Sequence, residues 1–333
     1  MKNLKFLPLV CAFLIFAAAT AFAKNDGKVL LIVETDMGND IDDAIALDVL
    51  YKYADAGMVD IVAIGNHKYS PTATAYIDIM NCWYGYPNIP MAQSNTPVIN
   101  IAAPDYTLPV VYSEVYPRHK YLPKLSTQVE LYRRILAKAD DDSIVVLSLG
   151  FATELAKLLD SPADDISPLT GRELVARKVK MLSVMAGSYG AKKRAEFNVK
   201  NDIPAMQKVF AEWDTPIVQN PFELGKQVMF PATAITDGLS WAKNHPLADG
   251  YANYHAMPYD RPTWDVLSAI YIFYPEMFTG EKGTVTVDDK GYTLFEPSAS
   301  GKHIVLSPLT DAQASALLDH MLKTVAEHPK KRR

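Results

Sequence analysis

The sequence has little cysteine, no excess of positive charge and no long apolar segment, and each of these shortages excludes a class of protein. Only Cys11 and Cys82 occur in 333 residues, and Cys11 falls in the leader described below, so the mature chain cannot form an intramolecular disulfide. The formal net charge of −5 argues against nucleic-acid binding. The chain has no internal repeat, and no glycine-rich turn of the dinucleotide-binding kind follows its first strand.

Residues 1–23 have the composition of a secretory signal peptide. Lys2 and Lys5 precede an apolar run over 6–16, and the segment ends in a small-x-small cleavage site, Ala-Phe-Ala. The apolar run is too short for a membrane-spanning helix. We therefore expect export to the periplasm or the cell exterior, a single mature domain over 24–333, and no membrane attachment after cleavage. Loss of the two leader lysines moves the formal charge from −5 to −7.

The mature chain opens with a strand followed by a turn rich in carboxylates. Residues 29–33 are five consecutive aliphatics, typical of a buried strand in a parallel sheet, and a helical pattern starts at Ile41. The carboxylates of this region are Glu34, Asp36, Asp40, Asp42 and Asp43. Crowded like charges cost stability unless a cation neutralises them, and hard divalent cations prefer carboxylate oxygens. An acidic helix N-terminus explains the later aspartates but not Asp36, which ends the strand, so we favour a metal site.

Strand and helix patterns alternate along the chain and predict an α/β fold, a mostly parallel, doubly wound sheet flanked by helices. Further buried strands are expected over 58–66, 89–92, 143–150, 179–187 and 216–218. A late β-hairpin is expected over 284–294 and a closing helix over 311–327. Residues 95–125 show neither the helical nor the strand period of hydrophobic residues, and their aromatic content indicates an ordered loop. Ligands gather at the carboxyl ends of strands in such sheets, where Asp36 and Asn66 fall.

Four motifs follow the first strand in a fixed order: the acidic turn, Gly65-Asn66, Glu196-Phe197-Asn198 and Trp264-Asp265. With this set the chain resembles the inosine-uridine preferring nucleoside hydrolase superfamily from Val29 through at least Phe278. The family turn reads Asp-x-Asp-Pro-Gly-x-Asp-Asp-Ala, whereas residues 34–44 read Glu-Thr-Asp-Met-Gly-Asn-Asp-Ile-Asp-Asp-Ala, longer by two residues. The resemblance implies the nucleoside hydrolase fold, and homodimers or homotetramers are common in the family.

The resemblance also implies one Ca²⁺ at the base of the pocket and roles for the residues around it. Asp36 would be the general base for a metal-bound water. The implied metal ligands are Asp36, Asp43, Asp265 and the backbone carbonyl of Thr153. The implied ribose-binding residues are Asp42, Asn66, Glu196 and Asn198. Glu196 and Asn198, two apart on extended backbone, are expected to point the same way. Because the turn is longer, the register of Asp42 and Asp43 stays open, with Asp40 as an alternative.

The implied reaction is hydrolysis of the N-glycosidic bond of a ribonucleoside or related N-ribosyl compound. A divalent ion, a carboxylate base and several hydroxyl-binding groups suit its oxocarbenium-like transition state. Trp264 stands where many purine- and pyrimidine-cleaving members have a histidine that helps to protonate the leaving base. The candidates for contact with the leaving group are His255, Tyr254 and Trp264. Two alternatives stay open: a metal-loaded ribose- or sugar-binding protein without turnover, and a hydrolase of a different glycoside.

Overall fold

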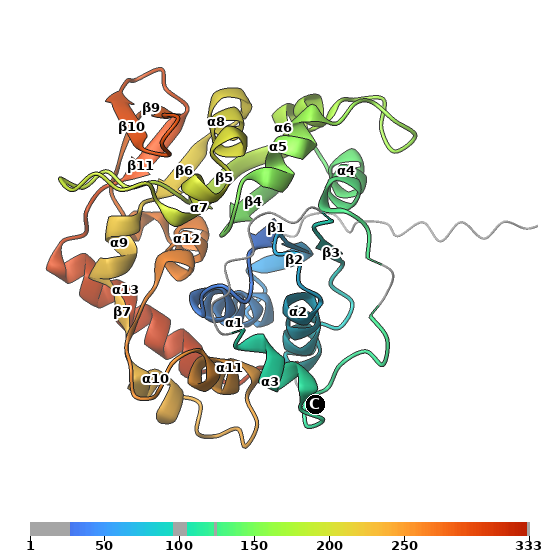
Figure 1. Cartoon of the computed structure of the whole chain (residues 1–333), viewed down its shortest axis with the longest axis vertical. Coiled ribbons are helices and arrows are strands. Elements are labelled where there is room, and N and C mark those ends of the chain that lie inside the picture. The colour runs from blue at the N-terminus through green and yellow to red at the C-terminus, as the bar shows by residue number, and fades with distance from the viewer. Residues whose placement is uncertain (1–26, 96–104, 123–124, 332–333) are drawn as a thin grey trace, which may run out of the picture.

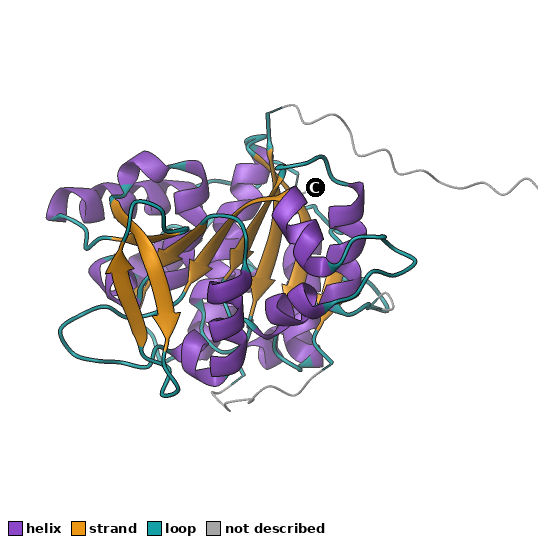
Figure 2. Ribbon diagram, turned by 90° about the horizontal axis from the view of Figure 1, so that it is seen from above, coloured by secondary structure: helices purple, strands orange, loops and turns teal. Residues whose placement is uncertain are grey.

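The computed structural model describes residues 27–95, 105–122 and 125–331, so the predicted signal peptide lies outside the described residues. The centre of the molecule is a nine-stranded sheet (Figure 2). In spatial order its strands are β10 (Thr293–Pro297), β9 (Gly280–Val287), β11 (His303–Leu306), β6 (Ile217–Asn220), β5 (Val179–Met185), β4 (Ile144–Ser148), β1 (Val29–Thr35), β2 (Val59–Asn66) and β3 (Met91–Gln93). A short antiparallel pair, β7 (Met229–Phe230) and β8 (Arg261–Pro262), lies apart from it.

The order of the parallel strands confirms the doubly wound sheet. β1 pairs in parallel with both β2 and β4, so the chain fills one side of β1 with β2 and β3 and then the other side with β4, β5 and β6. The position between β1 and β4 is therefore a topological switch point, where open α/β sheets bind ligands. β9 runs antiparallel to β10 and to β11, which confirms the late hairpin.

Helices cover both faces of the sheet (Figure 1). The helices are α1 (Asp42–Asp55), α2 (Pro71–Trp83), α3 (Thr107–Tyr112), α4 (Gln128–Lys138), α5 (Thr153–Asp160), α6 (Gly171–Lys178), α7 (Phe197–Asn201), α8 (Ile203–Glu212), α9 (Phe222–Gln227), α10 (Ala232–Thr236), α11 (Pro246–Tyr254), α12 (Trp264–Phe273) and α13 (Asp311–Ala326). None of them, among the residues described, combines the length and the apolarity needed to cross a bilayer.

Two hydrophobic cores, one on each face, hold these layers together. Leu31 and Val33 of β1 pack into the core formed with α1, α2, α12 and α13, whereas Ile32 packs into the core formed with α4, α5, α6 and α8. Alternate residues of a strand point to opposite faces, so a strand buried on both sides must be apolar throughout. This explains the unbroken aliphatic run over residues 29–33.

Two local expectations were wrong. Residues 95–125 were expected to form a loop throughout, but α3 lies within them; it is only six residues long and contains Pro109, so it has no detectable helical period. Glu196 and Asn198 were expected on extended backbone, but Glu196 is the N-cap of α7 and Asn198 lies in its first turn. Both carboxylate oxygens of Glu196 are turned onto the amides at the start of that helix.

Candidate active site

A cavity of about 270 Å³ opens at the carboxyl ends of β1, β4 and β5, beside the switch point of the sheet. One wall is formed by carboxylates and polar side chains: Asp36, Asn39, Asp40, Asp42, Asp43, Glu196, Asn198 and Asp265. The other lining residues form an apolar, mostly aromatic wall: Leu149, Met185, Phe197, Phe222, Tyr254 and Trp264. A cavity lined by both kinds of side chain suits a ligand with a hydroxylated part and a flat apolar part.

Asp36 is held at the end of β1 by its own turn and by β4. The side-chain amide of Asn39 donates a 2.7 Å hydrogen bond to Asp36 Oδ2. A Cβ atom on Gly150, just after β4, would lie 2.9 Å from Asp36 Cβ, so only glycine lets the two segments approach this closely. Burial raises the pKa of the Asp36 carboxyl above its ordinary value, although Asn39 opposes the shift.

The turn that follows needs a glycine and is braced by α3. Gly38 has φ +96°, a left-handed conformation that other residues rarely adopt. The buried Tyr106 hydroxyl accepts a 3.2 Å hydrogen bond from the Gly38 amide and donates a 2.9 Å bond to the Asp40 carbonyl. The turn is therefore fixed on both sides of Asn39.

Three buried carboxylates meet beside Asp36. Asp42 and Asp43 begin α1, Asp265 lies in the first turn of α12, and their oxygens can all lie within 4.8 Å of one another. The hydroxyl of Thr35 donates a short hydrogen bond to Asp43 Oδ1. Burial, and then the neighbouring carboxylates, raise the pKa values of Asp42, Asp43 and Asp265 well above the ordinary range. Such a group must hold either protons or a cation.

The donor set of this group fits a hard divalent cation. It consists of carboxylate oxygens, with Asp36 on the same side of the cavity, and it contains no sulfur or nitrogen ligand. A divalent ion would neutralise the mutual repulsion of Asp42, Asp43 and Asp265. The structure thus brings together three of the four predicted metal ligands, Asp36, Asp43 and Asp265, and it places Asp42, which was predicted to contact the sugar, within the carboxylate group.

Asp40 is engaged elsewhere. Its carboxylate forms a two-point ion pair with Arg261 of β8, with Arg261 Nε 2.8 Å from Asp40 Oδ1 and Nη2 close to Oδ2. Neither side chain is more than a quarter exposed. With Asp40 bound to a guanidinium, the structure favours Asp42 and Asp43 as the members of the carboxylate group.

Glu196 and Asn198 line the cavity but also hold α7 in place. Glu196 accepts hydrogen bonds from the amides of Gly187, Asn198 and Val199, while burial raises its pKa to about 7. Asn198 donates through Nδ2 to the carbonyls of Leu149 and Met185, both at 3.1 Å. These bonds tie α7 to the ends of β4 and β5 and leave the Asn198 carbonyl oxygen for a ligand.

The aromatic wall is built around Trp264. Its ring stacks on Phe222, with centroids 5.5 Å apart, and its indole nitrogen donates a 2.8 Å hydrogen bond to the Phe222 carbonyl. The Arg261 guanidinium lies 5.4 Å from the Trp264 ring and 5.0 Å from the Tyr254 ring. Gly225 makes room for this arrangement, because a Cβ atom there would overlap the indole.

Three predicted residues lie outside the cavity. Thr153, predicted to offer its backbone carbonyl, begins α5 and is not part of the cavity lining, and its hydroxyl donates a hydrogen bond to Asp202 at the start of α8. The Asn66 side chain donates to Thr74 and accepts from the Lys68 amide, which closes the turn after β2. His255 is exposed and is not part of the cavity lining, whereas its neighbour Tyr254 is.

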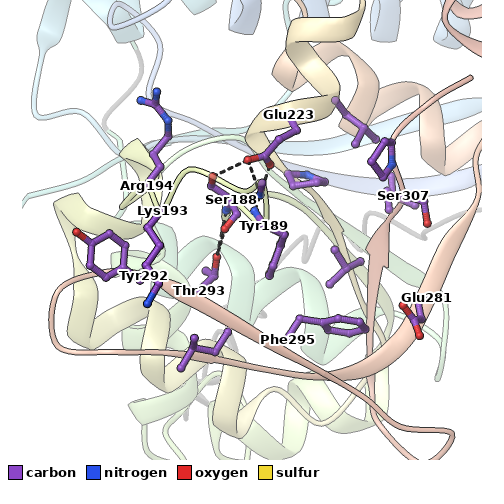
Figure 3. A pocket seen from close by; sticks show the side chains of 17 residues that line it. Ser188, Tyr189, Lys193, Arg194, Glu223, Glu281, Tyr292, Thr293, Phe295 and Ser307 are labelled. Carbon is purple, nitrogen blue, oxygen red and sulfur yellow. Dashed lines mark hydrogen bonds between the residues drawn. The ribbon is translucent and has the colours of Figure 1, made fainter. Parts of the chain in front are cut away.

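A larger cavity of about 470 Å³ lies next to this one, between α9 and the β9–β10 hairpin (Figure 3). Its main carboxylate, Glu223, is already occupied, since it accepts hydrogen bonds from the Ser188 hydroxyl and from the Tyr189 and Gly190 amides. It has no group of converging carboxylates among the residues that line it. We therefore assign the chemistry to the smaller cavity.

Two cavity residues, Asn39 and Phe222, and Arg261, which contacts the cavity lining, escaped prediction from the sequence. Asn39 lies inside the acidic turn and Arg261 lies three residues before Trp264, so both were close to recognised motifs. Phe222 follows β6, in a segment without any chemical signal in the sequence. The place of such a residue in the cavity can be recognised only from the structure, in which β5 and β6 lie side by side.

Comparison with known proteins gives the family. The model of the inosine-uridine preferring nucleoside hydrolases matches residues 31–319. The chain belongs to this family. Like its members, this nucleoside hydrolase is an enzyme that acts on N-glycosidic bonds, and the metal dependence of the family agrees with the acidic group described above.

Solved nucleoside hydrolases have the same fold. A plant nucleoside hydrolase is 21% identical, with 88% of this chain and 98% of that chain covered at a TM-score of 0.67. The inosine-uridine preferring enzyme of Bacillus anthracis is 17% identical, with 89% and 99% covered at a TM-score of 0.68. A purine-preferring ribonucleoside hydrolase from Gardnerella vaginalis is 14% identical, with 89% of this chain and 99% of that chain covered at a TM-score of 0.68. No curated protein matches this chain.

Proposed function

We propose that this nucleoside hydrolase cleaves a ribonucleoside or a related N-ribosyl compound with the help of Ca²⁺. The observation that carries the proposal is the buried group of Asp42, Asp43 and Asp265 beside Asp36. These carboxylates would hold the ion. When bound, the cation supplies positive charge that lowers the pKa of nearby water and keeps the carboxylates ionised.

Asp36 is the proposed general base. Asn39 occupies Oδ2 of its carboxylate, which leaves Oδ1 to accept a proton from the attacking water. Burial raises the pKa of Asp36, and this makes it a stronger base than an exposed aspartate. The close packing of Gly150 fixes the position of Asp36, so the proton acceptor is already oriented before substrate enters.

The remaining side chains of the cavity would bind the substrate. Asn198 and Glu196 belong to the polar wall and suit ribose hydroxyls, while Phe222, Tyr254 and Trp264 suit a flat aglycone by stacking. An aromatic wall without a histidine favours leaving groups that depart without full protonation. Among N-ribosides this points to compounds whose leaving group is a stable neutral or weakly basic heterocycle.

The test is release of ribose from inosine, uridine, adenosine and nicotinamide riboside by the purified protein, with Ca²⁺ or with a chelator. We expect release from at least one substrate in Ca²⁺, loss of release in chelator, and recovery when Ca²⁺ is added back. Asp36→Asn should lower kcat by about 10²–10⁴-fold, the usual contribution of a general base. Asp319→Asn, which changes an exposed aspartate of α13, is the matched control and should leave kcat unchanged.

Two outcomes would contradict the proposal. If the protein binds metal but releases ribose from none of the four substrates, a sugar-binding protein is favoured. Calorimetry would then detect the binding of ribose. Equal activity of Asp36→Asn and the unsubstituted protein would exclude Asp36 as the base.

We also propose that the chain is exported, because its first residues have the pattern of a signal peptide. Expression in a bacterial host and mass spectrometry of the protein from the periplasmic fraction test this. The expected N-terminus is Lys24. An intact N-terminus in the cytoplasmic fraction would argue against export.

A further inference from the structure

A second group of metal-binding side chains lies away from the carboxylates, where α2 meets the segment after α3. Asp78 and Cys82 stand one turn apart on α2 and therefore share a face of the helix. His119 comes from the segment that follows α3. The ligand atoms of the three residues can all lie within 4.8 Å of one another, so two separate parts of the chain converge on one point.

The distances within this group are close to those of a tetrahedral metal site. Cys82 Sγ lies 3.8 Å from His119 Nδ1 and 4.0 Å from Asp78 Oδ1. Ligands bonded to zinc at roughly 2.0–2.3 Å lie about 3.3–3.8 Å apart at the tetrahedral angle. The two separations that involve sulfur thus need only a small adjustment. His119 Nδ1 and Asp78 Oδ1, 2.6 Å apart, are joined by a hydrogen bond that would open when an ion replaces its proton.

Asp78 is a buried carboxylate whose partners come from the same group of three residues. Its side chain is 2% exposed, and in the described part of the chain no lysine or arginine pairs with it. Its contacts are the ring and the amide of His119 and the thiol of Cys82. A divalent cation with an aspartate, a thiolate and a neutral imidazole forms a group with no net charge, which is the least costly arrangement for a buried site.

We propose that Asp78, Cys82 and His119 bind a transition-metal ion of the zinc class. The thiolate and the imidazole select Zn²⁺ or a similar ion over Ca²⁺, whereas the oxygen-only group of Asp42, Asp43 and Asp265 has the opposite preference. The chain therefore has two cation sites of different chemistry. This inference is independent of the proposed nucleosidase activity.

The surroundings leave an access route and a fourth coordination position. Cys82 lines an open cavity of about 850 Å³, together with Pro117 and Asn244, and the His119 side chain is 38% exposed. Water can reach the site from this side and complete a four-coordinate ion. Lys330 and Lys331 line the same cavity, and a loaded site without net charge would not repel them.

An ion at this site would fasten the segment after α3 to α2. The segment is already held at Tyr116, which is buried and bonds to Asp249, whereas Tyr121 beyond His119 is 78% exposed, so an ion would add a second attachment between these two positions. α3 in turn carries Tyr106 to the acidic turn of the active site. We assign the proposed ion a structural role, comparable to a disulfide in a chain that has only one cysteine outside its leader.

Cobalt is the probe for the test, because Co²⁺ bound to a thiolate has a near-ultraviolet charge-transfer band and a four-coordinate ion has intense visible bands. The full-length protein is saturated with Ca²⁺, which fills the carboxylate site, and is then titrated with Co²⁺. We expect both sets of bands at one equivalent, and their loss when Zn²⁺ is added. Cys82→Ser should abolish the charge-transfer band, and His119→Ala should weaken Co²⁺ binding roughly tenfold or more.

Two controls separate this site from others. His328→Ala changes an exposed histidine, and Asp265→Asn changes the carboxylate group; both should keep the charge-transfer band. The proposal is overturned if the unsubstituted protein shows no such band, if Cys82→Ser keeps it, or if His328→Ala loses it equally. Circular dichroism confirms the fold of each variant, and because His119 lies outside helix and strand, His119→Ala tests the site even if Cys82→Ser misfolds.

Discussion

The backbone amide of Asp265 donates a 3.0 Å hydrogen bond to Oδ2 of Asp42, which joins the start of α12 to the start of α1 across 223 positions of sequence. Two helix N-termini thus meet at the carboxylate group. Partial positive charge at both termini reduces the repulsion among Asp42, Asp43 and Asp265 but does not remove it, since all three pKa values remain raised.

Asp265→Asn should therefore have opposite effects on the metal-free and the Ca²⁺-loaded protein. Without metal, one of the repelling carboxylates is gone, so we expect equal or higher thermal stability. With saturating Ca²⁺, the stabilisation of the unsubstituted protein, about 2.7 kcal/mol at a hundred times the dissociation constant, should be largely lost. Thermal unfolding with and without Ca²⁺ measures both effects, with Asp319→Asn as the control. A full Ca²⁺-dependent shift in Asp265→Asn would exclude Asp265 as a ligand.

Glu196 should make the metal-free protein less stable as pH rises. Its pKa is about 7 in the folded protein and about 4.5 when unfolded, because burial disfavours the charged form. The folded state therefore binds more protons between these values, so its contribution is present below pH 4.5 and lost as pH rises through 7. The loss is about 3 kcal/mol. Urea unfolding across this range should show a steeper fall for the unsubstituted protein than for Glu196→Gln, and identical slopes would contradict the prediction.

Gly150→Ala should impair catalysis by displacing Asp36. The added methyl group would lie 2.9 Å from Asp36 Cβ and 3.0 Å from its amide nitrogen, so the end of β1 must shift. We expect a fall in kcat of about 10²-fold, as for other small misplacements of a reacting group, and a loss of about 1–3 kcal/mol in the free energy of unfolding.

The double variant Gly150→Ala/Asp36→Asn identifies the mechanism of that loss. If Gly150 acts through Asp36, the double variant should be no slower than Asp36→Asn alone. Additive losses in kcat would show that Gly150 affects the site in another way.

The ion pair of Asp40 and Arg261 should contribute measurably to stability, because both side chains are at least three-quarters buried. Arg261→Met alone leaves Asp40 unpaired close to Asp42, and it also removes the cation that lies against Tyr254 and Trp264. We expect a coupling energy of about 1 kcal/mol in a double-mutant cycle with Asp40→Asn, measured by urea unfolding. A coupling near zero would mean that Arg261 acts only through the aromatic rings.

The sequence predicts the sheet and the acidic turn well because each rests on local chemistry. Five consecutive aliphatics, rich in β-branched residues and soon followed by a glycine, favour a strand buried on both faces, and Asp36 and Asp43 follow it within a few residues. The register of the aspartates could not be predicted, since it depends on Arg261, which lies 221 positions beyond Asp40. The aromatic wall was missed for a similar reason. Nothing in the sequence near Phe222 indicates its contact with Trp264, because that contact depends on where β6 ends in the sheet.

Asn66 shows a further limit. Its place at the end of β2 suggested a role in ribose binding, but its side chain is hydrogen-bonded to Thr74 and to the Lys68 amide. Such competition between a local partner and a ligand is decided by tertiary contacts, which the motif does not contain.

The buried hydroxyl of Tyr106 has a consequence for how this turn could be altered. The turn places the Gly38 amide and the Asp40 carbonyl against Tyr106, and the Asp40 carboxylate against Arg261. Deleting residues from the turn would remove these hydrogen-bond partners from the Tyr106 hydroxyl and the Arg261 guanidinium at once. Grafting this turn onto a relative would fail for the same reason unless both partners were transferred with it. We therefore expect the length of the turn and the residues at positions 106 and 261 to vary together among related sequences.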